Sequence, residues 1–199
     1  ASSLLSLERT ALNIAMHLSG VASFTHKIVE KLKNTDIKLA DTRKTTPGLR
    51  IFEKYAFKCG GGINHRMGLY DAAMIKENHI AWSDNLINSV QRLRENIPFT
   101  SHIIIEAETI EQAKEAIIAG ADSILLDEIN PDLLRTSIKE LRMTSQELYK
   151  QNNGKRLIIE VSGINHLEID KYLIEGIDFI STSSCVTKSK WIDFSMRYI

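Results

Sequence analysis

Short apolar runs alternate with longer amphipathic stretches along most of the chain. Residues 109–119 have helical spacing, begin with Thr followed three residues later by Gln, and end before Gly120, which predicts a capped helix. Pro131 after Asn130 predicts the start of a second helix, and residues 165–174 predict a third. Strands that alternate with helices in this way favour a parallel sheet with crossover connections. The predicted strands are residues 37–41, 55–59, 73–76, 102–107, 123–127, 157–161 and 179–182.

A long helix, roughly residues 4–33, is predicted before the first strand. We interpret it as a connecting or interface helix, because a β/α barrel has no place for it. The chain then divides into a linking helix at residues 1–35 and a barrel domain at residues 36–199. About seven strands is one fewer than a complete β/α barrel has. The predicted fold class is therefore α/β, an incomplete parallel β/α barrel of about seven strands preceded by a long N-terminal helix.

The composition is that of an ordinary globular protein of one domain, with 199 residues and 43% hydrophobic residues. The formal net charge is zero, which argues against a general nucleic-acid or membrane-surface binder, although a local basic pocket stays possible. Apolar runs are far too short to span a membrane, and the N-terminus lacks the features of a signal peptide. Cys59 and Cys185 are too few for a metal cluster and are expected to be reduced thiols of a cytoplasmic protein.

Cationic residues follow several predicted strands, and β/α barrels place their chemistry at the carboxyl ends of strands. Arg43 and Lys44 come after the first strand and could face a shared anion, or could be two solvated surface cations. His65 and Arg66 follow three glycines, which permit close backbone approach to a ligand or form only a flexible turn. Lys76 ends a predicted apolar strand, and lysine is rarely buried without a partner. We therefore favour a role for Lys76 in the site over that of a surface cation.

Acidic and small residues follow the later strands. Glu106 and Asp127 could hold ribose hydroxyls or a Mg²⁺ carried by phosphates, although either could instead cap the following helix. Ser162 with Gly163, and the serine-rich run 181–184, expose backbone N–H groups that suit a phosphate. No Walker-type loop or dinucleotide fingerprint is present.

The run DTRKTTPGLRIFEKYAFKCGGGINHRMGLYDAAMIKENHI, residues 41–80, resembles the signature block of the quinolinate phosphoribosyltransferases. Matching segments also occur at residues 8–13, 18–20, 119–127 and 160–163. The resemblance implies transfer of a phosphoribosyl group from phosphoribosyl pyrophosphate to the ring nitrogen of quinolinate. Loss of one carboxylate then gives nicotinate mononucleotide, pyrophosphate and CO₂, a step of NAD biosynthesis. It also implies Mg²⁺ bound with the donor, and a homodimer or higher homo-oligomer with no nucleic-acid or membrane partner.

The resemblance assigns roles residue by residue. Lys44 would stabilise the leaving pyrophosphate, and Glu106 and Asp127 would bind the ribose hydroxyls where positive charge develops. His65 would orient a carboxylate rather than act as a general base. The substrate-binding residues that the resemblance implies are Arg43, His65, Arg66 and Lys76 for the quinolinate carboxylates, Arg9 for a neighbouring subunit's site, and Ser162, Gly163 and Ser183 for the 5′-phosphate.

The chain also departs from the family pattern. The family's N-terminal α/β domain of ~100 residues is missing, an ordinary size for a domain. Ile164 replaces a glycine, Ile104 replaces an acidic residue, and the run 183–186 replaces Gly-Ala-Leu-Thr. These departures leave open a truncated non-catalytic remnant or a binding subunit of the same fold. The molybdenum-transport-associated paralog is a further alternative, against which the run IKENHI at residues 75–80 argues.

Overall fold

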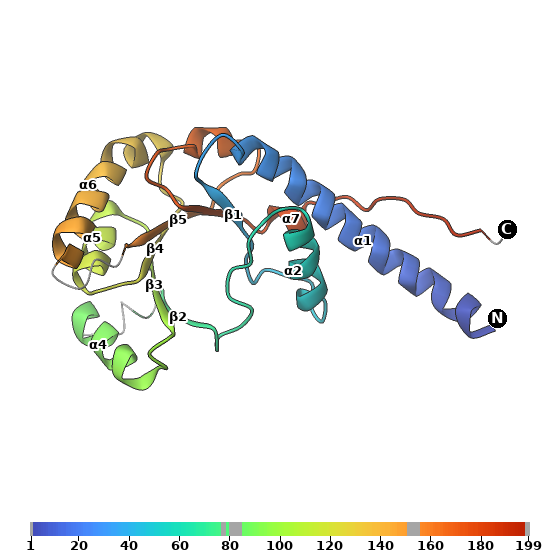
Figure 1. Cartoon of the computed structure of the whole chain (residues 1–199), viewed down its shortest axis with the longest axis horizontal. Helices are drawn as coiled ribbons and strands as arrows, with labels where there is room; N and C mark the ends of the chain where they lie inside the picture. Colours follow the sequence, from blue (N-terminus) through green and yellow to red (C-terminus); the bar gives the residue numbers. More distant parts are fainter. Residues whose placement is uncertain (1, 77–78, 80–84, 151–155, 198–199) are drawn as a thin grey trace.

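The computed structural model describes residues 2–76, 79, 85–150 and 156–197 (Figure 1). Within these residues six parallel strands form one sheet in the order β1-β6-β5-β4-β3-β2. Successive strands are neighbours from β2 to β6, and β1 pairs with β6. The strands are β1 (Lys38–Ala40), β2 (Ala72–Ile75), β3 (His102–Ala107), β4 (Ser123–Asp127), β5 (Ile158–Ser162) and β6 (Phe179–Ser181).

Helices cover the outer face of the curved sheet, and the first helix projects beyond it (Figure 1). This first helix contributes Val21, Ile28 and Leu32 to the main buried core, next to strand β1 and the second helix. No helix among the described residues has the length and apolar character that crossing a membrane requires. The helices are α1 (Ser2–Leu32), α2 (Arg50–Cys59), α4 (Leu86–Asn96), α5 (Ile110–Ile118), α6 (Pro131–Lys150), α7 (Ser184–Thr187) and the 3₁₀ helix η1 (Ile169–Tyr172).

The helix boundaries predicted from capping residues are confirmed. Thr109 Oγ1 accepts a hydrogen bond from the backbone N–H of Gln112 at 3.1 Å, which caps α5. Gly120 follows α5 with a φ of +87°, the left-handed backbone that commonly ends a helix. Pro131 is the first residue of α6, and Asn130 Oδ1 accepts from the N–H of Asp132 at 2.8 Å.

Two predicted elements are wrong. Residues 55–59 belong to helix α2, so the sheet of the described residues has six strands and not seven. Ala56 and Phe57 are buried with Glu53 and Lys54, whereas Tyr55 is exposed, so burial follows a helical period and not a two-residue one. The helix predicted at residues 165–174 contains only the four-residue turn η1.

Alternation along the strands separates two apolar regions. Ile103 and Ile105 of β3 belong to the large core shared with the helices, whereas Ile104 packs with Leu125 and Ala72 in a small separate cluster. Residues two apart on a strand share a face. Glu106 therefore lies on the face of Ile104, and the same alternation places the polar strand ends together on the inner face of the sheet.

β1 and β2 are consecutive in the chain but lie at opposite ends of the strand order. The described residues show no pairing between them, and one isolated parallel bridge joins Ala40 of β1 to Ile63. Ile63 N also donates to Leu39 O at 2.8 Å. The segment between Gly60 and Asp71 therefore runs along the free edge of β1 and carries His65 and Arg66 to the inner face.

Candidate active site

A cavity of about 330 Å³ lies at the carboxyl ends of the strands. A second hollow of about 600 Å³ beside β2 shares Arg43, Arg66 and Lys76 with it, so these three cations stand where the two spaces meet. The first cavity is lined by Asp41, Thr42, Arg43, Lys44, His65, Arg66, Met74, Lys76, Glu106, Leu125, Asp127, Glu160, Ser162 and Ser181.

Most of the residues predicted from the sequence line this cavity together. They are Arg43, Lys44, His65, Arg66, Lys76, Glu106, Asp127 and Ser162. Arg9, Gly163 and Ser183 do not line it: Arg9 is exposed on α1, Gly163 follows the last residue of β5, and Ser183 precedes α7. Glu77 and Asn78, within the run 75–80, lie outside the described residues.

An ion pair joins the cationic and acidic parts of the cavity. Lys76 Nζ lies 2.5 Å from Glu106 Oε2, with the lysine side chain 47% exposed and the glutamate side chain 10% exposed. Thr109 caps α5, so the alternative in which Glu106 caps that helix is wrong. Asn130 caps α6, so Asp127 does not cap that helix either; Asp127 lines the cavity.

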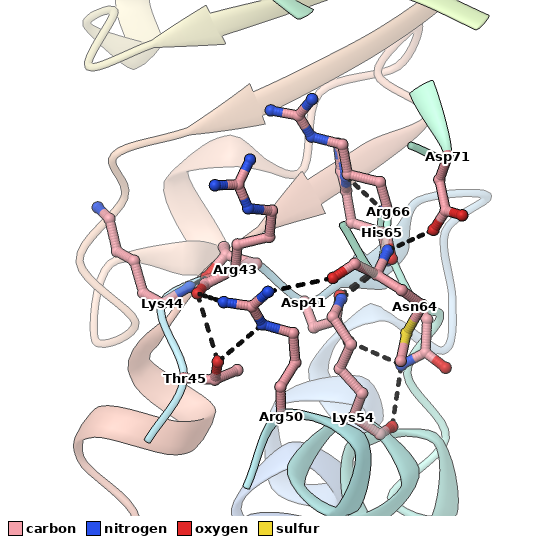
Figure 2. A network of polar contacts seen from close by, with 12 residues as sticks. Asp41, Arg43, Lys44, Thr45, Arg50, Lys54, Asn64, His65, Arg66 and Asp71 are labelled. Atoms are coloured by element: carbon pink, nitrogen blue, oxygen red, sulfur yellow. Dashed lines mark hydrogen bonds and ion pairs between the residues drawn. The ribbon is translucent and has the colours of Figure 1, made fainter. Parts of the chain in front are cut away.

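A buried network around Asp41 fixes the segment that carries His65 and Arg66 (Figure 2). Asp41 is 3% exposed, forms an ion pair with buried Lys54, and accepts from the backbone N–H of His65 at 2.8 Å. Its second oxygen accepts from Asn64 Nδ2 at 2.7 Å. Lys54 Nζ also donates to His65 O at 3.0 Å. Buried charges are tolerated when they are paired and hydrogen-bonded, and here the bonds hold the segment at several points.

Arg50 of α2 anchors the segment that carries Arg43 and Lys44. Its Nε donates to Thr45 Oγ1 at 3.1 Å, and its two terminal nitrogens donate to Arg43 O at 3.5 Å and Met67 O at 3.3 Å. Arg50 therefore holds the segment through two carbonyls and the Thr45 hydroxyl, and none of these bonds involves the Arg43 or Lys44 side chain. Figure 2 shows the side chains of Arg43 and Arg66 extending in the same direction, away from this anchor.

Arg66 is oriented by strand β2. Its Nη1 donates to Ala72 O at 2.9 Å, and its Nη2 donates to Met74 Sδ at 3.2 Å. Burial, and after it the positive charge of Arg43, lowers the pKa of the Arg66 guanidinium, while Glu106 opposes this shift. Arginine remains charged even with a lowered pKa. Two neighbouring cations that raise each other's energy create a place that an anion would stabilise.

The sequence predictions missed several residues of the site. Asp41 directly follows the first strand, and a polar residue at a strand end could have indicated a site residue. Its role as an anchor could not be predicted, because it depends on Lys54 and Asn64 elsewhere in the chain. Glu160 belongs to the recognised segment 160–163 and is nearly buried in the cavity wall. Met74 and Leu125 supply an apolar lining that could contact an aromatic ring. The described residues contain no group of three or more His, Cys, Asp or Glu side chains arranged to hold a metal ion.

The chain is similar to known proteins over nearly its whole length. Residues 21–197 match the family described as "Quinolinate phosphoribosyl transferase, C-terminal domain". A probable carboxylating nicotinate-nucleotide pyrophosphorylase of Synechocystis sp. is 39% identical over 197 residues, 99% of this chain and 64% of that protein. A protein of Bacillus subtilis with the same description is 40% identical over 196 residues, 98% of this chain and 64% of that protein.

A solved structure, NadC from Streptococcus pyogenes, has a TM-score of 0.86 and 40% identity. The alignment covers 98% of this chain and 65% of that chain. The chain spans less than two thirds of the length of these relatives.

Proposed function

The chain belongs to the quinolinate phosphoribosyltransferase family, and we propose that it carries the active site of a carboxylating nicotinate-nucleotide pyrophosphorylase. The proposed reaction joins quinolinate to phosphoribosyl pyrophosphate and releases pyrophosphate and CO₂ in NAD biosynthesis. One observation carries the proposal: Arg43, Lys44, Arg66 and Lys76 share a cavity with Glu106 and Asp127. Both substrates are polyanions, and an anion-binding wall opposite hydroxyl-binding carboxylates fits their chemistry.

We propose that quinolinate binds at the junction of the two hollows. Arg43, Arg66 and Lys76 would bind its two carboxylates, and Met74 and Leu125 would contact its ring. His65 would donate one further hydrogen bond. A guanidinium can bind a carboxylate with two parallel hydrogen bonds, which fixes the plane of the ligand as well as its position. The ring nitrogen is thereby oriented for attack on the donor.

The donor would occupy the neighbouring space with its ribose toward Glu106 and Asp127. As the ring nitrogen bonds to C1′, the bond from C1′ to the pyrophosphate oxygen breaks and positive charge develops on the ribose. Glu106 and Asp127 would stabilise that charge, and Lys44 would stabilise the leaving pyrophosphate. Mg²⁺ bound with the donor would supply further neutralisation of the phosphates. We propose that the metal arrives with the donor, since Glu106 and Asp127 are too few to form a complete protein site.

Decarboxylation follows once the bond between the ring nitrogen and C1′ has formed. Once the ring nitrogen is quaternary, the electron pair of the breaking C–CO₂⁻ bond stays on the ring carbon beside that nitrogen, CO₂ leaves, and the ring carbon takes a proton from water. The ring is the electron sink, so no side chain has to act as a strong base. We propose that the cationic side chains contribute by orientation.

We propose that Ser162, Gly163 and Ser183 hold the 5′-phosphate of the donor. Gly163 has a φ of +73°, and an added Cβ would lie 2.4 Å from Glu128 Cγ, so the backbone at this turn requires glycine. Ser183 lies directly before α7. A rim of small side chains leaves room for a phosphate close to the backbone.

We propose that the complete site forms in a homodimer or larger homo-oligomer. Arg9 is exposed in the first third of α1, where it could reach a neighbouring subunit. The N-terminal end of α1 projects beyond the sheet (Figure 1). Ile51, Phe52 and Tyr55 form an exposed apolar face on α2, which is consistent with burial in an interface. The open sheet then corresponds to an incomplete β/α barrel, and two free thiols and zero net charge are consistent with a cytoplasmic enzyme without nucleic-acid or membrane partners.

Two measurements test the proposal. Nicotinate mononucleotide is assayed with quinolinate, phosphoribosyl pyrophosphate and Mg²⁺, and quinolinate affinity is measured by calorimetry in the same preparation. We expect product that depends on both substrates, and a large loss of rate in Glu106→Gln and Asp127→Asn. Quinolinate binding without product would instead support a non-catalytic binding subunit. Absence of quinolinate binding would contradict the assignment and favour the molybdenum-transport-associated paralog.

A further inference from the structure

The protein itself fixes the proton position of His65. The backbone N–H of Arg66 donates to His65 Nδ1 at 2.7 Å. A backbone N–H can only donate, so Nδ1 must accept and carries no proton in this arrangement. A neutral imidazole then has its proton on Nε2. Conversion to imidazolium would place a second proton at Nδ1 and break the bond from Arg66.

The Nε2 atom lies beside a buried carboxylate. His65 Nε2 is 3.4 Å from Glu160 Oε2, and Glu160 is 5% exposed on the inner face of β5. This distance is longer than that of a normal hydrogen bond. The Nε2 proton is therefore attracted toward Glu160 and remains able to donate to another acceptor. The other oxygen, Glu160 Oε1, is buried and has no hydrogen-bond partner among the described residues. A buried carboxylate oxygen without a partner carries a cost in free energy.

The side chains of His65 and Glu160 lie between two hollows. His65, Arg66 and Glu160 line the proposed active site and also another hollow of about 320 Å³, which extends to the first residues of the strands. Glu160 is therefore a negative charge in the wall of a site whose other side is strongly cationic.

We propose that Glu160 is a positioning residue that, together with the backbone N–H of Arg66, holds the His65 ring so that its single Nε2–H can be donated to a quinolinate carboxylate bound by Arg66. This inference rests on the proposed function for the identity of the ligand. The tautomer of His65 does not depend on it. His65 thus contributes one directed hydrogen bond and no charge, and Glu160 acts through His65 without touching the reacting atoms.

The first test is the tautomer of His65 in the protein without substrates. We expect ¹⁵N chemical shifts of a protonated Nε2 and an unprotonated Nδ1 at neutral pH. In Glu160→Gln we expect the same tautomer, because the backbone N–H of Arg66 still donates to Nδ1. A wild-type His65 that is an imidazolium, or that carries its proton on Nδ1, would overturn the proposal.

The second test separates the two substrates kinetically. Glu160→Gln should raise KM for quinolinate about ten-fold, the size expected for one impaired hydrogen bond to a charged group, with KM for phosphoribosyl pyrophosphate and kcat within about two-fold. In a His65→Ala background the same change should add no further effect, because Glu160 acts through His65. Glu115→Gln, on the exposed side of α5, is the matched control and should match the wild type.

The outcomes distinguish the two proposals. An equal rise in both KM values, or an undiminished effect of Glu160→Gln in the His65→Ala background, would assign Glu160 a general structural role and overturn the inference. No product from the wild-type protein would contradict the proposed function, while the ¹⁵N measurement would still decide the tautomer. Unfolding midpoints of the variants show whether a kinetic change comes from loss of the fold.

Discussion

Lys76 Nζ and Glu106 Oε2 lie 2.5 Å apart across the ends of the neighbouring strands β2 and β3. Lys76 is half-exposed and Glu106 is largely buried, so the lysine can move toward a ligand more easily than the glutamate can. An anionic ligand must therefore compete with Glu106 for the ammonium group. When Lys76 turns to a ligand carboxylate, Glu106 becomes free to accept from a hydroxyl, which couples the two halves of the site.

Lys76→Met should weaken quinolinate binding about ten-fold, because the ligand loses one charged hydrogen bond. Calorimetric titration with quinolinate measures the change. Lys114→Met is the matched control, since Lys114 pairs with Glu140 away from the cavity lining, and it should bind quinolinate as the wild type does. Unchanged affinity in Lys76→Met would remove Lys76 from the proposed carboxylate site.

Arg66→Ala should abolish measurable quinolinate binding and spare phosphoribosyl pyrophosphate. The guanidinium is held by Ala72 O and Met74 Sδ, so the wild-type side chain is already oriented before the ligand arrives. Arg66→Lys should recover only part of the affinity, because an ammonium group cannot form two parallel bonds to a carboxylate. Separate titrations with each substrate give the comparison, and equal losses for both substrates would contradict the assignment.

Lys54→Met should destabilise the fold by roughly 3–5 kcal/mol, the cost of leaving a buried carboxylate without its partner. Lys54 is 2% exposed, and its removal leaves Asp41 as an unpaired buried charge. Urea unfolding measures the free energy. Lys31→Met, which breaks the exposed pair with Asp170, should cost less than about 1 kcal/mol. A similar small loss in Lys54→Met would show that water reaches Asp41 readily.

The Cys185 thiol should make stability depend on alkaline pH. Burial is the main cause that raises its pKa from 9.0 to about 11, and the neighbouring Thr25 side chain opposes the shift. The folded state keeps the proton where the unfolded chain loses it, so this contribution is complete below pH 9 and is lost as pH rises toward 11.

The measurement is the free energy of unfolding between pH 8 and pH 11 in the wild type and in Cys185→Ala. We expect a shallower decline with rising pH in the variant. Cys59→Ala, at an exposed thiol, is the control and should follow the wild-type curve. Parallel curves for wild type and Cys185→Ala would show that the thiol ionises equally in both states.

The positions of the strands and of most cavity residues could be predicted because they depend on local pattern. An apolar run followed by Lys76, Glu106 or Asp127 indicates a strand with a functional end, and the sheet brings these ends together. Residues 55–59 were assigned wrongly because a short, mostly apolar run of five residues fits one strand or about one and a half helical turns equally well. Lys54 and Arg50 could not be predicted, since their partners are distant segments that only the fold brings close.

The interrupted strand order has a consequence for recognition. In a closed ring the backbone groups on the outer edge of β2 would be used by the next strand. Here Ala72 O, on that edge strand, accepts from the Arg66 guanidinium instead. The backbone carbonyl of Ala72 thus orients the side chain of Arg66, which is proposed to bind the ligand. Geometry of this kind depends on the backbone carbonyl of Ala72 and not on its methyl side chain.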